Sequence, residues 1–154
     1  MLRSLSIFLI IIAFQITGTK DASAQNTPTP SLNHIAVYVQ DLSISTAFYS
    51  DIMGLRIIPE PFKDGRHTWF SLGNAGQLHL ISGAKEISEH DKNSHLCFSV
   101  DSVESFIVKL DKNKIDYINW KGDSKLPTIR ADGVKQIYFK DPNGYWLEIN
   151  NDRL

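Results

Sequence analysis

Four residues with metal-binding side chains lie at alternating positions within short apolar segments: His34, His79, His95 and Glu148. The first and third begin segments that read HIAVYV and HLCFSV, in which apolar side chains alternate with others. This alternation predicts β-strands, because successive side chains of a strand point to opposite faces of its sheet. The apolar set would pack against a helix, and the four candidate residues would lie on the other face. Three imidazoles and a carboxylate suit zinc, nickel, iron or manganese, with coordination positions left open for water or a substrate.

Each of these residues also has a simpler explanation. A single histidine on a strand is more often structural than a metal ligand, and Glu148 avoids any burial cost if its side chain reaches water. His34 and His95 favour the metal interpretation because they occupy the same place in two similar segments. His79 has the least support from its position. If Gly76 is aligned with Gly144, His79 falls opposite Leu147, and matching it to Glu148 requires a shift of one residue.

The similar segments begin two halves with the same order of elements. HIAVYVQDLSISTAFYSDI from His34 matches HLCFSVDSVESFIVKLDKN from His95 in its apolar pattern without a gap. Each half is predicted to form a strand, a helix and three more strands, at residues 32–82 (module 1) and 94–150 (module 2). The expected fold is α+β, a single domain at residues 32–150. In it, two repeated βαβββ modules form a curved, partly closed mixed sheet around a cavity.

The remaining predicted elements are short. Predicted strands cover residues 32–40, 55–58, 68–72 and 77–81 in module 1 and 95–100, 116–120, 134–139 and 145–149 in module 2. Asp141-Pro142-Asn143-Gly144 has Pro and Gly where a type I turn favours them. Residues 59–66 and 121–133 are predicted loops, and we expect them to determine specificity. Three arginines are candidates to hold a substrate carboxylate or simply to face water: Arg56, Arg66 and Arg130.

The beginning of the sequence has the features of an export signal. Arg3 precedes an apolar run at residues 5–14, which is too short to span a bilayer. Ala22-Ser23-Ala24 follows, a pattern of small residues that signal peptidase accepts. We therefore expect residues 1–24 to be a signal peptide, residues 25–31 a flexible spacer, and the mature protein to be periplasmic or secreted. The alternative is an uncleaved N-terminal anchor.

Composition excludes several classes of function. Of the 154 residues, 42% are hydrophobic and 21% charged, and the formal net charge of −1 offers no basic surface for nucleic acid or, after signal cleavage, for a membrane. The single cysteine, Cys97, excludes an internal disulfide and a thiolate zinc cluster. It is either a small buried side chain or a neighbour of the metal site. No P-loop, dinucleotide-binding or G-x-S-x-G motif is present, so no residue is assigned to an organic cofactor.

The sequence resembles the vicinal oxygen chelate superfamily, which includes glyoxalase I, methylmalonyl-CoA epimerase, extradiol dioxygenases, and fosfomycin and bleomycin resistance proteins. LNHIAVYVQDLSISTAFYSDIMGLRI, GQLHLI, SHLCFSV and IYFKDPNGYWLEIN carry the resemblance, which extends over residues 32–150. It implies metal ligands on the first, fourth, fifth and last strands, at His34, His79, His95 and Glu148. Many glyoxalases have Glu where this sequence has His79.

The resemblance implies three classes of function. The first is a metal-dependent lyase or isomerase of the glyoxalase I type, which binds a small substrate through vicinal oxygens and moves a proton at a carbon beside a metal-bound carbonyl. Glu148 or His79 would then transfer the proton. The second is an extradiol-type iron(II) dioxygenase that uses His34, His95 and Glu148. The third is a non-catalytic binding or resistance protein. The two modules could pair within one chain or between two chains, and the second arrangement would be a homodimer.

Overall fold

The computed structural model describes residues 29–153. The predicted signal peptide and most of the predicted spacer therefore lie outside the described residues. Residues 31–154 form one compact unit. No helix among the described residues is both long and apolar enough to cross a membrane.

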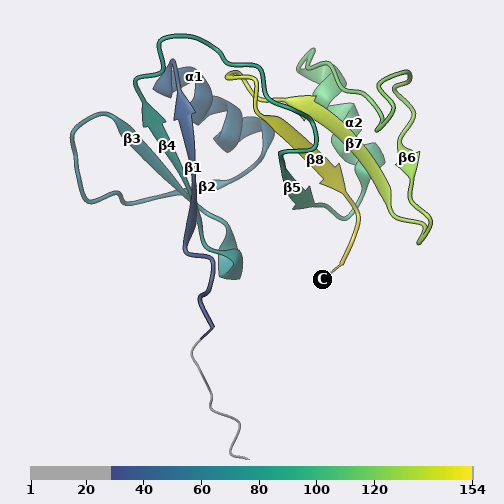
Figure 1. The fold of residues 1–154 in the computed structure, drawn as a ribbon, viewed down its shortest axis with the longest axis horizontal. Coiled ribbons are helices and arrows are strands. Elements are labelled where there is room, and N and C mark those ends of the chain that lie inside the picture. Colours follow the sequence, from purple (N-terminus) through teal and green to yellow (C-terminus); the bar gives the residue numbers. More distant parts are fainter. Residues whose placement is uncertain (1–28, 154) are drawn as a thin grey trace, which may run out of the picture. The chain divides into compact units, whose positions relative to one another are not determined.

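Each half of this unit folds as a βαβββ module, as predicted (Figure 1). The elements of module 1 are β1 (His34–Val39), α1 (Leu42–Ala47) with a π-helical continuation (Phe48–Ile52), β2 (Arg56–Ile58), β3 (His67–Ser71), a 3-10 turn (Gly73–Ala75) and β4 (Gln77–Ser82). Those of module 2 are β5 (His95–Ser99), α2 (Val103–Lys112), β6 (Thr128–Ile129), β7 (Lys135–Lys140) and β8 (Trp146–Asn150).

The strands form two separate four-stranded mixed sheets rather than one continuous sheet. Sheet A has the order β1-β4-β3-β2 and sheet B the order β5-β8-β7-β6. In each sheet the first strand is parallel to its neighbour and the other pairs are antiparallel. The α+β class and the repeated modules are confirmed. Among the described residues no strand ladder joins β1 to β5, so both are edge strands.

One predicted strand is wrong. Residues 116–120 form only an isolated bridge, in which Ile118 exchanges two backbone hydrogen bonds of 2.8 Å with Tyr138. The ladder stops there because the Asn119 side chain accepts hydrogen bonds from the amides of Gly122 and Asp123 and turns the chain away. The edge position beside β7 is instead taken by β6, from within the predicted loop at 121–133.

A single hydrophobic core lies on the helix-covered faces of both sheets. Buried side chains from sheet A and sheet B pack with those of α1 and α2, and Phe48 contacts Phe139 across the modules with a ring-centroid distance of 6.3 Å. The alternation predicted from the sequence holds, because Val37 and Val39 are buried while His34 and Tyr38 are exposed. Burial of these faces leaves the opposite faces open for a site.

The turn between β7 and β8 also connects the two modules. Gly144 donates its amide to the Asp141 carbonyl at 3.1 Å, which closes the predicted turn. The Asn143 side chain donates to Ser45 Oγ at 2.9 Å and accepts from the Gln40 amide at 2.8 Å. Tyr49 Oη donates to the buried Asp141 carboxylate at 3.0 Å. These buried polar contacts fix module 2 against α1.

Candidate functional site

Strand register shows that the candidate residues are equivalent in the two modules. His34 begins β1 and His95 begins β5. His79 pairs with Ala36, two residues after His34, and Glu148 pairs with Cys97, two residues after His95. The next strand repeats the match, because Trp69 pairs with His79 and Tyr138 pairs with Glu148.

The one-residue shift in the sequence comparison has a structural explanation. Gly76 directly precedes β4, whereas Tyr145 separates Gly144 from β8. The extra residue, Tyr145, follows the tight turn. The turn requires glycine at position 144, because a Cβ there would lie 2.6 Å from the Ser88 carbonyl oxygen. Aligning the two glycines therefore misplaces β4 by one residue, and His79 is the counterpart of Glu148.

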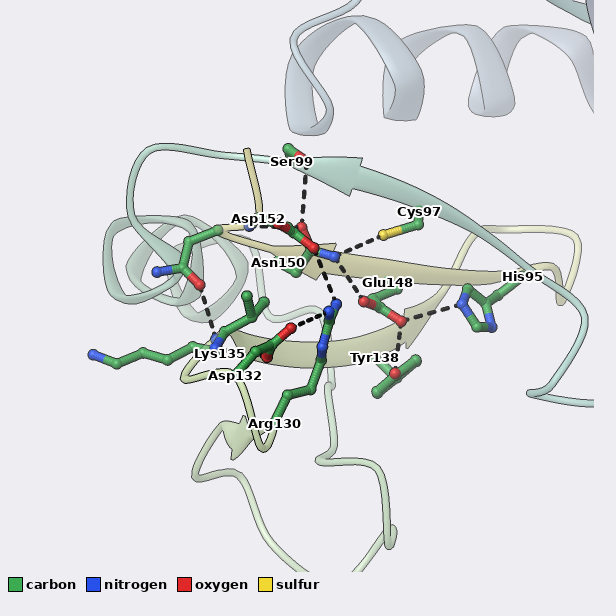
Figure 2. A network of polar contacts seen from close by, with 12 residues as sticks. His95, Cys97, Ser99, Arg130, Asp132, Lys135, Tyr138, Glu148, Asn150 and Asp152 are labelled. Carbon is green, nitrogen blue, oxygen red and sulfur yellow. Dashed lines mark hydrogen bonds and ion pairs between the residues drawn. The ribbon is translucent and has the colours of Figure 1, made fainter. Parts of the chain in front are cut away.

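The pair on sheet B brings two side chains that could bind a metal close together. His95 Nε2 lies 3.1 Å from Glu148 Oε2 (Figure 2). His95 Nδ1 lies 2.7 Å from the Lys92 carbonyl oxygen. A carbonyl oxygen only accepts, so Nδ1 carries a hydrogen and Nε2 is the ring nitrogen that faces the carboxylate. Metal-binding histidines are oriented by this kind of second hydrogen bond. Donors about 2.0–2.2 Å from one ion are separated by roughly 3–4 Å, which matches the observed spacing.

Glu148 is held as a carboxylate by its neighbours. It is only 6% exposed, and it accepts hydrogen bonds from Tyr138 Oη at 2.6 Å and Asn150 Nδ2 at 2.9 Å. Burial alone would raise its pKa, but hydrogen bonds from Tyr138, Asn150 and Cys97 and the charge of His95 lower the pKa overall. An anionic Oε2 at 3.1 Å from Nε2 is stabilised by a positive charge between the two atoms, either a proton on the ring or a metal ion in its place. The donor set therefore fits a divalent metal.

Cys97 lies on the same open face but is not prepared as a ligand. Partial burial of its sulfur and the neighbouring Glu148 raise the pKa of the thiol to about 12, so it stays protonated at neutral pH. Its Sγ accepts a hydrogen bond of 3.1 Å from Asn150 Nδ2. The residue is exposed, so the interpretation as a small buried side chain is wrong and Cys97 is a neighbour of Glu148.

The pair on sheet A is arranged as a stack. The rings of His34 and His79 are parallel within 12° at a centroid distance of 4.3 Å, and Trp69 stacks on the other face of His79 at 3.9 Å. His79 Nε2 is 2.8 Å from Gln77 Oε1, and His34 Nδ1 is 2.8 Å from Asn33 Oδ1. Burial, followed by the charges of His34 and His67, lowers the pKa of His79. Imidazole lone pairs lie in the ring plane, so two parallel rings cannot both point at one ion without a ring rotation.

The structure thus brings His95 to Glu148 and His34 to His79 as two separate pairs. Within residues 29–153, no three His, Cys, Asp or Glu side chains are close enough to hold one metal ion. Assignment of all four residues to one site stays a prediction.

The sequence analysis did not identify the role of Tyr138. The antiparallel register set by the turn at 141–144 places Tyr138 opposite Glu148, so the turn motif carried the signal. Arg130 lies near this network but is paired with Asp132 at 2.5 Å and Asp152 at 3.2 Å (Figure 2).

Comparison with known proteins identifies the family. Residues 31–149 match the model of the Glyoxalase/Bleomycin resistance protein/Dioxygenase superfamily, and the chain belongs to this superfamily. It is 28% identical over 129 residues to the uncharacterized protein YaeR of Escherichia coli, covering 77% of this chain and 93% of YaeR. It is 30% identical over 131 residues to human mitochondrial methylmalonyl-CoA epimerase, covering 77% of this chain and 72% of the epimerase. The solved structure of oxidase ChaP-H2 superposes with a TM-score of 0.67 at 25% identity, covering 82% of this chain and 96% of that one.

Proposed function

We propose that this member of the glyoxalase superfamily is a metal-dependent lyase or isomerase that acts on a small molecule with vicinal oxygens. One observation carries the proposal: the shared register that places His34 and His79 on sheet A where His95 and Glu148 stand on sheet B. A repeated fold that keeps metal-binding side chains at equivalent open-face positions is expected to use them together. The 30% identity to an epimerase supports proton transfer as the reaction type.

His95 and Glu148 would hold the ion, completed by His34 and His79. Their nitrogen and oxygen donors are compatible with zinc, nickel, iron or manganese. When bound, the ion would polarise a substrate carbonyl and acidify the adjacent C–H bond. The Lys92 carbonyl keeps the His95 ring oriented, and Tyr138 and Asn150 keep Glu148 anionic.

Two side chains are suited to move the substrate proton. Glu148 is a carboxylate with a lowered pKa, and it would accept the proton from the carbon beside the carbonyl. His79, whose lowered pKa keeps it neutral at neutral pH, would accept or return the proton from the other sheet. Trp69 stacks on His79 and Tyr138 contacts Glu148, and these two aromatic rings would limit water at the reacting carbon.

For all four residues to bind one ion, the pair of His34 and His79 must lie close to the pair of His95 and Glu148. His34 and His95 lie on the edge strands β1 and β5, whose free backbone groups can accept a further strand. Residues 35–37 of β1 line one pocket with His95 and Leu96 of β5. We propose that the two pairs come together across this pocket within one chain, or between two chains in a homodimer. Light scattering of the zinc-loaded protein distinguishes the two arrangements, because a dimer doubles the mass.

Metal analysis followed by hydrogen exchange tests the function. The purified protein should contain about one equivalent of a divalent metal by mass spectrometry of the elements. With metal, it should accelerate deuterium incorporation from D2O into hydroxyacetone, and Glu148→Gln should abolish the acceleration. Iron content with oxygen uptake on a catechol would instead support a dioxygenase. A protein that binds no added metal would be a binding protein.

We also propose that the protein is exported, on the basis of Arg3, the apolar run and Ala22-Ser23-Ala24. Mass spectrometry of protein from the native host should find Gln25, or its cyclised form, as the first residue. A cytosolic protein that retains Met1 would contradict this.

A further inference from the structure

Lys92 is a cation without a carboxylate partner beside the candidate metal pair. Of the 14 Lys and Arg side chains within residues 29–153, four have a carboxylate oxygen within 4.0 Å, and Lys92 is one of the ten that have none. The Lys92 ammonium instead donates to the Trp120 carbonyl oxygen. An ammonium has three N–H donors, so two remain for another acceptor.

Three aromatic rings hold this ammonium in place. Nζ of Lys92 lies 5.0 Å from the ring centroid of Trp120, 5.5 Å from that of Tyr138 and 5.9 Å from that of Trp146. These distances are within the range of cation–π interaction. The residue itself is half-buried. A cation that is oriented by rings and partly shielded from water binds an anion more strongly than a freely moving surface lysine does.

The same residue adjoins the metal pair by two routes. Its carbonyl oxygen accepts the hydrogen bond from His95 Nδ1, and its ammonium lies over the ring of Tyr138, whose hydroxyl donates to Glu148. The ring of Tyr138 therefore lies between the Lys92 ammonium and the Glu148 carboxylate.

We propose that Lys92 is an anion subsite, and that the substrate carries a carboxylate in addition to its metal-binding vicinal oxygens. The proposal deepens the proposed function and rests on it for the position of the vicinal oxygens. The anion would bind the free N–H donors of Lys92, and the planar walls of Trp120 and Trp146 favour a flat, conjugated molecule. Arg130 is less suited to this role because two aspartates already occupy it.

Two probes that differ only in charge test the subsite. The probes are 3,4-dihydroxybenzoate and 3,4-dihydroxybenzamide, which have the same vicinal oxygens and a remote carboxylate or amide. Calorimetric titration into zinc-loaded wild-type protein should give a Kd about tenfold lower for the benzoate, as expected for one charge-assisted hydrogen bond. Lys92→Met should reduce the preference to less than about twofold, and Lys92→Arg should restore part of it.

Lys140 supplies the matched control. Its Nζ also lies over Trp146, at 5.0 Å, but this lysine is exposed, and within residues 29–153 it has no cation–π contact with Tyr138 or Trp120. Lys140→Met should keep the full preference for the benzoate. Circular dichroism should show that all variants are folded, since Lys92→Met leaves the backbone carbonyl that orients His95.

The measurements test the anion subsite at Lys92 separately from the metal site. Zinc binding is measured without probes, so its absence overturns the proposed function alone. The charge preference is then measured on the metal-free protein, and a preference that disappears in Lys92→Met still supports the subsite. A preference that survives Lys92→Met, an equal loss in Lys140→Met, or no preference with and without zinc overturns the subsite.

Discussion

The two sheets place different chemistry at equivalent positions. On sheet B, Tyr138 donates a hydrogen bond to Glu148, and the Glu148 carboxylate lies 3.1 Å from Nε2 of His95. On sheet A, the matching residues His34, His79 and Trp69 form a face-to-face stack, with centroid distances of 4.3 and 3.9 Å. The repeated fold places these side chains at equivalent positions on the two sheets, and the residue types determine whether they form hydrogen bonds or stack.

The two sheets differ in how far their side chains are already oriented to bind a cation. On sheet B the charge of Glu148 and the fixed ring of His95 are in place before any ion arrives, which favours binding because little has to reorganise. On sheet A the stack must open before its nitrogens can point at an ion, and opening it costs the ring contacts. We therefore expect sheet B to supply most of the metal affinity.

The largest effect should come from His95→Ala. Removing its Nε2 leaves Glu148 as the single prepared ligand, so zinc affinity should fall by about 100-fold or more. Calorimetric titration with zinc measures this, and His67→Ala is the control because His67 is paired with Asp64 at 2.9 Å. Unchanged affinity in His95→Ala would remove the basis of the metal site.

A smaller loss should follow His79→Ala, which removes the counterpart of Glu148 on sheet A. Zinc affinity should fall by about tenfold, since the ion gains this ligand only after the stack opens. The same titration checks the order of the two variants. If His79→Ala costs more than His95→Ala, the assignment of the stronger half of the site to sheet B is wrong.

Tyr138→Phe and Trp69→Phe compare equivalent residues directly. Tyr138→Phe removes a hydrogen bond that lowers the pKa of Glu148, so zinc affinity should fall by about tenfold at neutral pH. The pH at which zinc is lost on acidification should also rise, because a carboxylate with a higher pKa is protonated sooner. Trp69→Phe keeps an aromatic ring on His79 and should change affinity less than about twofold. Equal effects of the two substitutions would contradict the comparison.

The smallest effect concerns the contact between the modules. Burial raises the pKa of Asp141, despite hydrogen bonds from Asn143, Tyr145 and Tyr49 that lower it. A carboxyl whose pKa is raised by folding stabilises the fold at low pH, and this stabilisation is lost as the pH rises through the folded pKa. Asp141→Asn cannot ionise, so its deficit in unfolding free energy, on the order of 1 kcal/mol in acid, should shrink as the pH rises. Urea unfolding at several pH values measures this, and a deficit that grows with pH would refute the account.

Much of the fold followed from the sequence, for identifiable reasons. Alternation in HIAVYV and HLCFSV separates the core face from the open face, and it correctly placed Val37 and Val39 in the core. The prediction of a strand at 116–120 was wrong because alternation does not reveal that the Asn119 side chain ends the ladder after one bridge.

The site was less predictable than the fold. Strand parity located the open-face residues, but the register between parallel strands depends on the backbone after Gly144, where one extra residue shifts the alignment. Ring orientation was also beyond the sequence, because the stack of His34, His79 and Trp69 depends on contacts between β1, β4 and β3. Lys92 was missed because the three rings near its ammonium, those of Trp120, Tyr138 and Trp146, lie far from it in the sequence.

The most direct test of the central claim is a crystal structure of the zinc-loaded protein with anomalous diffraction at the zinc edge. The account predicts one anomalous peak per chain, about 2.0–2.2 Å from both His95 Nε2 and Glu148 Oε2, with a histidine of sheet A as a further ligand. A peak that is bound away from His95 and Glu148, or no peak in protein soaked with excess zinc, would contradict it.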